Sequence, residues 1–311
     1  MNLAPTLFDL DYQELETSLV DLGEAQYRAR QIWEGVYKNL WDAPEEFTHI
    51  PLPLRTVLAT KYSPFSHLQP AEIQKSTDQE TTKTLFRLPD GQAIEAILMR
   101  YNRRRTLCIS TQAGCAMGCV FCATGQMGFR RHLSSGEIIE QVLYYARILA
   151  QKMEKVTNIV IMGMGEPFHN YEATMAAIDR LNHPWGFNFS ERRITVSTVG
   201  IVPGILKFTA ERRQVNLAIS LHAADDELRS SILPINKRHP LDELFAACRD
   251  YASVTRRRIT FEWALINEVN DSIQQAQRLA ERLRGLLCHV NIIPLNPTQQ
   301  YNGQAAPRKR V

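Results

Sequence analysis

Residues 108–125 read Cys108-Ile-Ser-Thr-Gln-Ala-Gly-Cys115-Ala-Met-Gly-Cys119-Val-Phe-Cys122-Ala-Thr-Gly. Three of these cysteines fall within eight residues, in the pattern Cys115-x3-Cys119-x2-Cys122. Thiolates at this spacing on one loop can each bind a different iron of a 4Fe–4S cluster. No fourth cysteine has a matching local spacing, so the fourth iron stays open. An open iron can chelate the amino and carboxylate groups of S-adenosylmethionine, and the pattern therefore predicts radical-SAM chemistry.

A zinc site is the rival interpretation of the same cysteines. Cys108 or His132 would then supply the fourth ligand. Structural zinc usually uses two short motifs that lie apart in the sequence, and no second pair is present. Unrelated buried thiols are a third interpretation. The spacing favours the iron–sulfur cluster over both.

On the C-terminal side of this motif, short β-like runs alternate with helical patterns. The expected strands are 106–111, 158–162, 193–197, 215–221, 259–265 and 290–294. The main expected helices are 135–152, 171–181, 241–255 and 271–286, and Ser134 with Glu137 forms a capping box for the first of them. This alternation predicts an α/β fold with a parallel sheet and crossover helices. Six strands fit a partial (β/α)6 barrel, the radical-SAM barrel, better than a closed eight-fold barrel.

The N-terminal side of the motif has a different character. Apolar residues at helical spacing predict helices within 11–22 and 24–40 and a short one that ends near residue 62. Strands are expected at 71–77, 83–88 and 92–99, with Asp90-Gly91 as the turn between the last two. These patterns predict a helical accessory domain (1–62), a β-hairpin connector (63–100) and a core domain (101–311).

Composition sets the class and compartment of the protein. The chain has 311 residues, of which 44% are hydrophobic and 22% charged, as is ordinary for a soluble globular protein. No apolar run is long enough to span a bilayer, and the first residues lack the features of a signal peptide. We therefore expect a cytoplasmic protein with no membrane partner. Thiols stay reduced there, which agrees with metal chemistry for the clustered cysteines.

Basic residues gather in short runs, although the formal net charge is only +3. These runs are 103–105, 130–131, 192–193, 212–213, 256–258 and 308–310. Any one of them, taken alone, fits the solvated end of a helix or strand. Their repetition favours a polyanionic partner.

The segment from Cys108 to Gly125 resembles the cluster segment of the RlmN/Cfr family of radical-SAM RNA adenine methyltransferases. The resemblance covers nearly the whole chain, from Tyr27-Arg-Ala-Arg-Gln-Ile-Trp33 to Asn291-Ile-Ile-Pro-Leu-Asn-Pro297. It implies a 4Fe–4S cluster on Cys115, Cys119 and Cys122, S-adenosylmethionine as cofactor and methyl donor, and 23S rRNA, with tRNA as a further substrate. It also implies an electron donor such as flavodoxin or ferredoxin, and we expect a monomer. The sequence does not choose between C2 and C8 of adenine, and C2 is the family's commoner outcome.

Residues that follow the predicted strands resemble the family's positions for S-adenosylmethionine. In Met162-Gly-Met-Gly-Glu166-Pro167, glycines let a ligand approach the backbone and a carboxylate can accept from an amine. The resemblance implies such contacts from Gly165 and Glu166. The other matching positions are Ser197, Ser220, Leu221, His222 and Asn296. Each polar one alone is more often a cap, a turn former or a structural histidine. As a set at successive strand ends, they predict a cofactor pocket at the mouth of the barrel.

Glu95 and Cys108 are the candidate catalytic residues. Glu95 is the only charge in residues 93–99 and shares one face of that strand with Ala93, Ile97 and Met99. Desolvation on such a face favours a carboxylate that can hold a proton near neutrality, whereas the alternative is a charged gatekeeper on an edge strand. Glu95 resembles the family's proton acceptor. Cys108 resembles the cysteine that resolves the covalent intermediate with RNA.

The family mechanism also needs a cysteine that carries the methyl group, in a segment that follows a sequence like 291–297. Residues 301–311 contain no cysteine, and Cys248 and Cys288 are typical of small core residues. Two hypotheses stay open at this point. The sequence represents an RNA methyltransferase, whole or as a fragment, or it is a family member that binds RNA and S-adenosylmethionine without methyl transfer or with another radical reaction.

Overall fold

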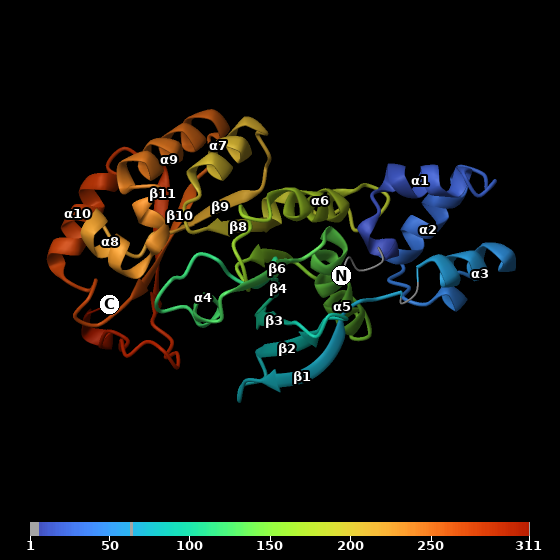
Figure 1. The fold of residues 1–311 in the computed structure, drawn as a ribbon, viewed down its shortest axis with the longest axis horizontal. Coiled ribbons are helices and arrows are strands. Elements are labelled where there is room, and N and C mark those ends of the chain that lie inside the picture. Colours follow the sequence, from blue (N-terminus) through green and yellow to red (C-terminus); the bar gives the residue numbers. More distant parts are fainter. Residues whose placement is uncertain (1–5, 63–64, 311) are drawn as a thin grey trace. The chain divides into compact units, whose positions relative to one another are not determined.

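The computed structural model describes residues 6–62 and 65–310 (Figure 1). They fall into two compact units, each built from three segments of the chain. The first unit comprises Met1–Ala113, His132–Gly163 and Glu172–Arg193, and the second comprises Gly114–Arg131, Met164–Tyr171 and Ile194–Val311. The domain boundary that the sequence predicts between residues 62 and 63 falls at residues 63–64, which lie outside the described part of the chain.

The first unit carries the N-terminal helices and five strands. Its elements are, in chain order, η1 (Leu7–Asp9), α1 (Tyr12–Val20), α2 (Tyr27–Tyr37), η2 (Pro44–Glu46), α3 (Leu52–Lys61), β1 (Gln69–Lys75), β2 (Thr81–Arg87), β3 (Ala93–Tyr101), β4 (Arg104–Cys108), α5 (Ser135–Ala150), β7 (Asn158–Ile161), α6 (Tyr171–Asn182) and η3 (Glu191–Arg193). Two short strands at the boundary of the units pair with each other, β5 (Gln112–Gly114) and β6 (Phe129–His132).

The strands of the first unit lie in the order β1-β2-β3-β4-β7. Pairing is antiparallel from β1 to β4 and parallel between β4 and β7. The predicted hairpin of β2 and β3 continues into the sheet, because β3 also pairs with β4 from Tyr101↔Arg104 to Ile97↔Cys108. Its role as a connector stays a prediction. The tight turn that joins them uses Asn102 in the left-handed region, at φ 44°, a conformation that asparagine tolerates.

Helix α5 is fixed on the antiparallel strands by one buried hydroxyl. Tyr145 donates its hydroxyl proton within a group of three acceptors, the Thr84 hydroxyl at 2.8 Å and the carbonyls of Ala96 and Thr82 at 3.1 and 3.2 Å. The predicted capping box starts this helix, since Ser134 and Glu137 exchange hydrogen bonds at 3.1 and 2.9 Å. This buried polar anchor sets the position of the helix along the strands.

The second unit is built on four parallel strands in the order β8-β9-β10-β11, around which α7 to α10 gather in Figure 1. Its elements are α4 (Ala123–Gln126), β8 (Ile194–Thr198), α7 (Val202–Ala210), β9 (Asn216–Ser220), α8 (Asp226–Ile232), η4 (Pro234–Lys237), α9 (Leu241–Thr255), β10 (Ile259–Leu265), α10 (Ile273–Leu283), β11 (Cys288–Pro294) and η5 (Arg308–Arg310). Aromatic rings fill the space between helices and strands. Phe245 of α9 meets Phe261 of β10 at 5.6 Å between centroids, and Phe208 of α7 stacks on Tyr251 at 6.1 Å.

A buried carboxylate fixes the segment that leads into β1. The side chain of Glu140 in α5 accepts hydrogen bonds from the backbone N–H groups of His67 and Leu68, at 2.8 and 3.0 Å, and from the Ser66 hydroxyl. Burial raises the pKa of Glu140 to about 7 from its usual 4.5, against the opposing effect of these hydrogen bonds. The folded protein therefore holds a proton here that the unfolded chain has released.

We expect Glu140→Gln to flatten the pH dependence of stability between pH 4.5 and 7. In this window the folded state binds more protons than the unfolded state, so the free energy of unfolding falls as pH rises, by at most ~1.4 kcal/mol per pH unit. Glutamine keeps an acceptor oxygen and has no charge to desolvate. Urea unfolding of both proteins at pH 5 and pH 7.5 measures the effect, and equal slopes in the two proteins would contradict it.

Candidate functional site

The loop of the three cysteines is closed at its base by a contact that only glycine permits. Gly114 has φ 70°, and a Cβ atom built on it would lie 1.9 Å from the carbonyl oxygen of Gly128. The N–H of Cys115 donates to that same carbonyl at 3.1 Å. Residues 114 and 128 thus bracket Cys115, Cys119 and Cys122 in one compact loop.

The same loop is docked on apolar side chains of the second unit. Val120 donates its N–H to the carbonyl of Ile232 at 3.1 Å, and Cys122 donates to the carbonyl of Cys119 at 3.1 Å. Met117, Val120 and Phe121 pack against a buried cluster that contains Ile232 and Leu233. The backbone that carries the thiols is therefore held by hydrogen bonds and by packing on both sides.

The thiols lie close enough to influence one another. Burial raises the pKa of the Cys115 thiol to about 11. Burial also raises the pKa of Cys119, and the charges of Cys122 and Cys115 raise it further. Such thiols stay protonated until cations replace the protons, as iron does when a cluster binds.

The donor set fits a 4Fe–4S cluster. Three soft thiolate donors stand on one loop, and each binds its own iron in such a cluster, so they need not converge on one point. Within residues 6–62 and 65–310, no three His, Cys, Asp or Glu side chains are in position to hold a single metal ion. This arrangement differs from what the zinc interpretation requires.

Arg229 of α8 is the cationic centre of the second unit. Its guanidinium is fully buried and donates to the carbonyls of Val199 at 2.7 Å, of Ser220 at 3.1 Å and of Leu221 at 3.1 Å, and to Oδ1 of Asn236 at 2.8 Å. Burial lowers its pKa to about 10, and the charge of Cys119 opposes this shift. The side chain thus links the ends of β8 and β9 and places positive charge beside the thiols.

Glu166 is buried, with 3% of its surface exposed. Its carboxylate accepts from the N–H groups of Val199 at 2.8 Å and Phe168 at 3.0 Å, and the Thr198 hydroxyl also bonds to it. Burial raises its pKa to about 7. Glu166 thus holds the turn that contains Gly165, whose φ is 105°, against the end of β8. Its contact with S-adenosylmethionine stays a prediction.

The other positions predicted to bind the cofactor lie at the carboxyl ends of the parallel strands. Ser197 is opposite Ala218 in the register of β8 and β9, and Ser220 is opposite Glu262 in that of β9 and β10. Both serines are half-buried, whereas Asn296, which follows β11, is exposed. The parallel register brings these strand ends to one edge of the sheet, as a pocket at the barrel mouth requires.

Leu221 and His222 follow β9 and differ in what they can offer a ligand. The Leu221 side chain is fully buried. Its N–H donates to the carbonyl of Glu262 at 3.1 Å, and its carbonyl accepts from Arg229 and Ala223, so its contact with the cofactor stays a prediction. His222 accepts the N–H of Ala264 on Nδ1 at 2.9 Å and lies edge-on to Phe121, with centroids 5.0 Å apart. Burial, and then the charge of Arg229, lowers its pKa to about 3. The imidazole is therefore neutral at pH 7, with its other nitrogen carrying the proton.

Glu95 and Cys108 lie in the first unit, on one face of its sheet. Cys108 is opposite Ile97 in the register of β3 and β4, and Glu95 is two residues from Ile97. Diagonal neighbours of this kind lie roughly 7–8 Å apart. Burial raises the pKa of the Cys108 thiol to about 12. The residues Ala93, Ile97 and Met99 are half-buried on the face of Glu95, as the alternation predicts.

The setting of Glu95 differs from the desolvated one that the sequence suggested. Its side chain is 37% exposed and pairs with the ammonium of Lys83 of β2 at 3.0 Å. The strand is also no edge, because β3 lies between β2 and β4. Lys83 reaches Glu95 because it is opposite Ile97, on the same face. The catalytic role of Glu95 stays a prediction.

Sequence reasoning missed three polar residues that shape this site. They are Lys83, Arg229 and Glu262. Glu262 is 8% exposed, and its carboxylate accepts from the amide of Asn291 at 2.8 Å, in the same row of the sheet as Ser220. A lone carboxylate in the apolar run Ile259–Leu265 was a usable signal for Glu262. Nothing in the local pattern separates Arg229 from the surface arginines.

Two protein-family models match the chain, one over the part that carries the cysteine loop and one over the N-terminal helices. A model of the radical SAM superfamily matches residues 109–280, more than half of the chain, and a model of the ribosomal RNA large subunit methyltransferase N-terminal domain matches residues 5–63. The crystal structure of a radical SAM methyltransferase from Sphaerobacter thermophilus is 51% identical, with a TM-score of 0.96 over 98% of this chain and 89% of that one.

Curated relatives agree with the family models. The chain is 48% identical to a probable dual-specificity RNA methyltransferase RlmN of Chloroflexus aurantiacus, over 94% of this chain and 80% of the relative. It is 47% identical to the dual-specificity RNA methyltransferase RlmN 1 of Myxococcus xanthus, over 96% and 82%. A parallel β-sheet with three loop cysteines and this likeness define a radical-SAM enzyme, whose cofactors are a 4Fe–4S cluster and S-adenosylmethionine. The chain belongs to the RlmN family.

We expect Cys119→Ala to lose the cluster, because two thiolates leave a second iron without a protein ligand. After anaerobic reconstitution, iron and acid-labile sulfide should fall from about four per chain to near zero, and 5′-deoxyadenosine should no longer form. Cys248→Ala is the matched control, since Cys248 is buried in α9 and outside the loop. Full iron and sulfide in Cys119→Ala would show that the cluster has other ligands.

Arg229→Met should destabilise the protein by about 3–5 kcal/mol, because it removes a buried charged donor from three carbonyls and one amide oxygen. Arg229→Lys keeps the charge but has no planar fork to reach four acceptors, and should recover only part of the loss. Chemical unfolding of the three proteins gives the values. A change below ~1 kcal/mol in Arg229→Met would mean that water satisfies the same acceptors.

Proposed function

We propose that this chain is a radical-SAM methyltransferase that adds a methyl group to C2 of an adenine in 23S rRNA and in tRNA. The observation that carries the proposal is the glycine-closed loop of Cys115, Cys119 and Cys122. The printed names of the relatives, dual-specificity RNA methyltransferases, support an RNA substrate and two kinds of target. They do not favour the alternative of a family member without methyl transfer.

The proposed roles in binding the cluster, binding the cofactor and removing the proton fall to different residues. The three loop cysteines would hold three irons, and the bound cluster with S-adenosylmethionine supplies the electron chemistry and the methyl group. Gly165, Glu166, Ser197, Ser220, His222 and Asn296, with the backbone of Leu221, are proposed to receive the cofactor at the strand ends. Glu95 is proposed to take the proton from the adenine ring, with Lys83 orienting its carboxylate at 3.0 Å.

Cys108 is proposed as the resolving thiol. Its raised pKa, about 12, keeps it protonated and unreactive at neutral pH until the reaction reaches it. Cys108 and Glu95 share one face of the sheet, which supports roles for both on one reacting base. A buried thiol beside a base is an arrangement in which sulfur attack can follow proton removal.

We propose that the helices of residues 1–62 bind RNA and that residues 63–100 connect them to the core of residues 101–311. We also propose that the protein acts as a monomer and that flavodoxin or ferredoxin reduces it. No helix among the described residues has both the length and the apolar character to cross a bilayer. A cytoplasmic site of action fits the RNA substrates that we propose.

The test is mass spectrometry of adenosine from rRNA and tRNA incubated with reconstituted protein, S-adenosylmethionine and reductant. We expect 2-methyladenosine, lost in Cys119→Ala and reduced about 10²–10⁴-fold in Glu95→Gln, the range for removal of a general base. A parallel sample carries the family's cysteine-bearing C-terminal segment appended to residue 311. In that extended form, Cys108→Ala should accumulate RNA bound covalently to protein.

The outcomes separate the roles. Both Glu95→Gln and Cys108→Ala should still form 5′-deoxyadenosine without RNA, because neither is a cluster ligand. Unmodified adenosine from both the 311-residue protein and its extended form, with a full cluster present, would overturn the proposed function. Methylation at C8 in place of C2 would correct the position and keep the reaction class.

A further inference from the structure

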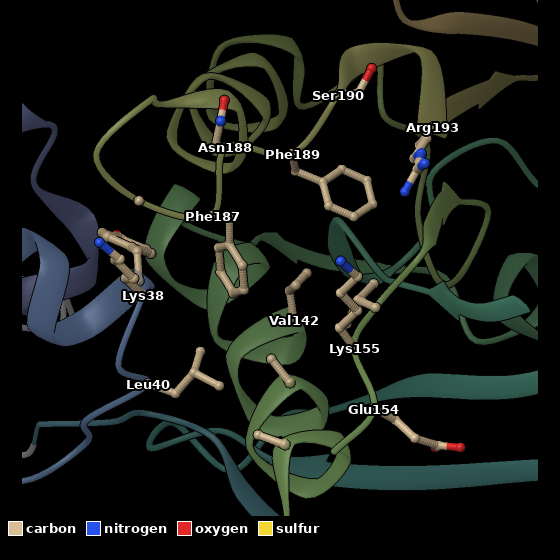
Figure 2. Close-up of a pocket in the computed structure, with 15 residues that line it drawn as sticks. Lys38, Leu40, Val142, Glu154, Lys155, Phe187, Asn188, Phe189, Ser190 and Arg193 are labelled. Atoms are coloured by element: carbon tan, nitrogen blue, oxygen red, sulfur yellow. The ribbon is translucent and has the colours of Figure 1, made fainter. Parts of the chain in front are cut away.

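A pocket of about 590 Å³ lies wholly within the first unit (Figure 2). It is bounded by the end of α2, the C-terminal half of α5 and residues 186–193. Lys155, which lines it, precedes β7 by three residues, whereas Gly165 and Glu166 follow the carboxyl end of that strand. The pocket is therefore no part of the site proposed for the cofactor.

Three cations without ionic partners line this pocket. Lys38, Lys155 and Arg193 are all exposed, and within the described residues none of the three forms an ion pair. The one acidic side chain of the lining, Glu154, is already paired with Arg105. Uncompensated positive charge around a cavity of this size attracts an anion.

Aromatic rings supply a second kind of contact. Figure 2 shows the rings of Phe187 and Phe189 extending into the pocket, with Lys38 on the side of Phe187 and Arg193 on the side of Phe189. Phe187 is half-buried, and its ring lies 6.2 Å from that of Tyr37. Rings beside unpaired cations are the combination with which proteins bind nucleotides, by stacking on the base and neutralising the phosphate.

The loop that carries the two phenylalanines is rigidly held. Gly186 and Asn188 donate their N–H groups to the carbonyl of His183 at 3.0 and 3.2 Å, and Phe189 donates to that of Leu181 at 2.8 Å. Asn188 has φ 49°, and a Cβ on Gly186 would lie 3.0 Å from the Cβ of Tyr37. The rings are thus pre-positioned, which lowers the entropy cost of binding.

We infer that this pocket binds one unreacting nucleotide of the RNA substrate, with its phosphate on Lys38, Lys155 and Arg193 and its base against the half-buried ring of Phe187, beside the buried Phe189. The inference rests on the proposed function for its choice of RNA. It assigns to the RNA a second point of attachment, remote from the reacting adenine. Such a contact raises affinity for RNA and leaves the chemistry of the cofactor unchanged.

The test compares RNA binding by the reconstituted holoprotein and its variants, using fluorescence anisotropy with tRNA and 23S rRNA transcripts. Lys155→Gln with Arg193→Gln should weaken binding roughly tenfold or more and lower the slope of log Kd against log salt by about 1.5. Lys152→Gln with Arg284→Gln is the matched control, since both residues are exposed and lie outside the pocket. It should leave affinity and slope close to those of the parent.

Phe187→Leu isolates the stacking contact. It keeps an apolar side chain, so the fold should persist, but it removes the ring, and we expect affinity to fall about 5- to 100-fold with an unchanged salt slope. Formation of 5′-deoxyadenosine without RNA should be equal in every variant. Full RNA affinity in both the double variant and Phe187→Leu would overturn the inference.

A free nucleotide is the other source of the same chemistry. If adenosine or uridine monophosphate raised the melting temperature of the parent and not of the double variant, while RNA affinity stayed equal in both, the pocket would be a nucleotide site and the inference would fall. The inference and the proposed function fail separately. RNA bound through the pocket without any methyladenosine sinks only the function, and methylation with the same KM for RNA in all variants sinks only the inference.

Discussion

The buried guanidinium of Arg229 is the interaction on which the second unit depends. Where parallel strands end, their last carbonyls turn away from the ladder and need donors that the sheet no longer supplies. Arg229 supplies them to Val199, Ser220 and Leu221 at once. The same charge lies near Cys119, where anionic sulfur is expected once iron binds. One side chain therefore satisfies the carbonyls at the strand ends and offsets the negative charge expected on the cysteine loop.

Two glycines impose the complementary constraint on the loop itself. The contact between Gly114 and the carbonyl of Gly128 leaves no room for a side chain at position 114. Because the loop is closed there, the thiols are carried by a fixed backbone before any metal arrives. This pre-organisation lowers the cost of gathering three anionic ligands.

Much of this arrangement follows from local pattern, and the exceptions have physical reasons. The helix Leu241–Thr255 and the strand Ile259–Leu265 have the predicted limits, because their apolar periods are regular and turns border them. Helices α7 and α8 were missed, since Val202-Pro203-Gly204 resembles a turn and α8 is only seven residues long. Cysteine spacing located the loop. Partners far apart in the sequence were not predicted. Lys83 pairs with Glu95 because of the register of β2 and β3. The four hydrogen bonds of Arg229 likewise depend on how the chain folds and not on a local sequence pattern.

The two units interleave along the chain, and this decides which residues can be exchanged together in evolution. The chain passes from one unit to the other at residues 113/114, 131/132, 163/164, 171/172 and 193/194, which makes five crossings. Glu95 and Cys108 belong to one unit, and the cluster loop to the other. Neither unit corresponds to one contiguous stretch of gene, but Glu95 and Cys108 share the single segment that ends at Ala113. One exchange of that segment therefore carries the proposed base and resolving thiol together and leaves the cluster loop behind. The N-terminal helices up to Lys61 are also contiguous, so one exchange can replace them while the proposed base, the resolving thiol and the cluster loop stay together.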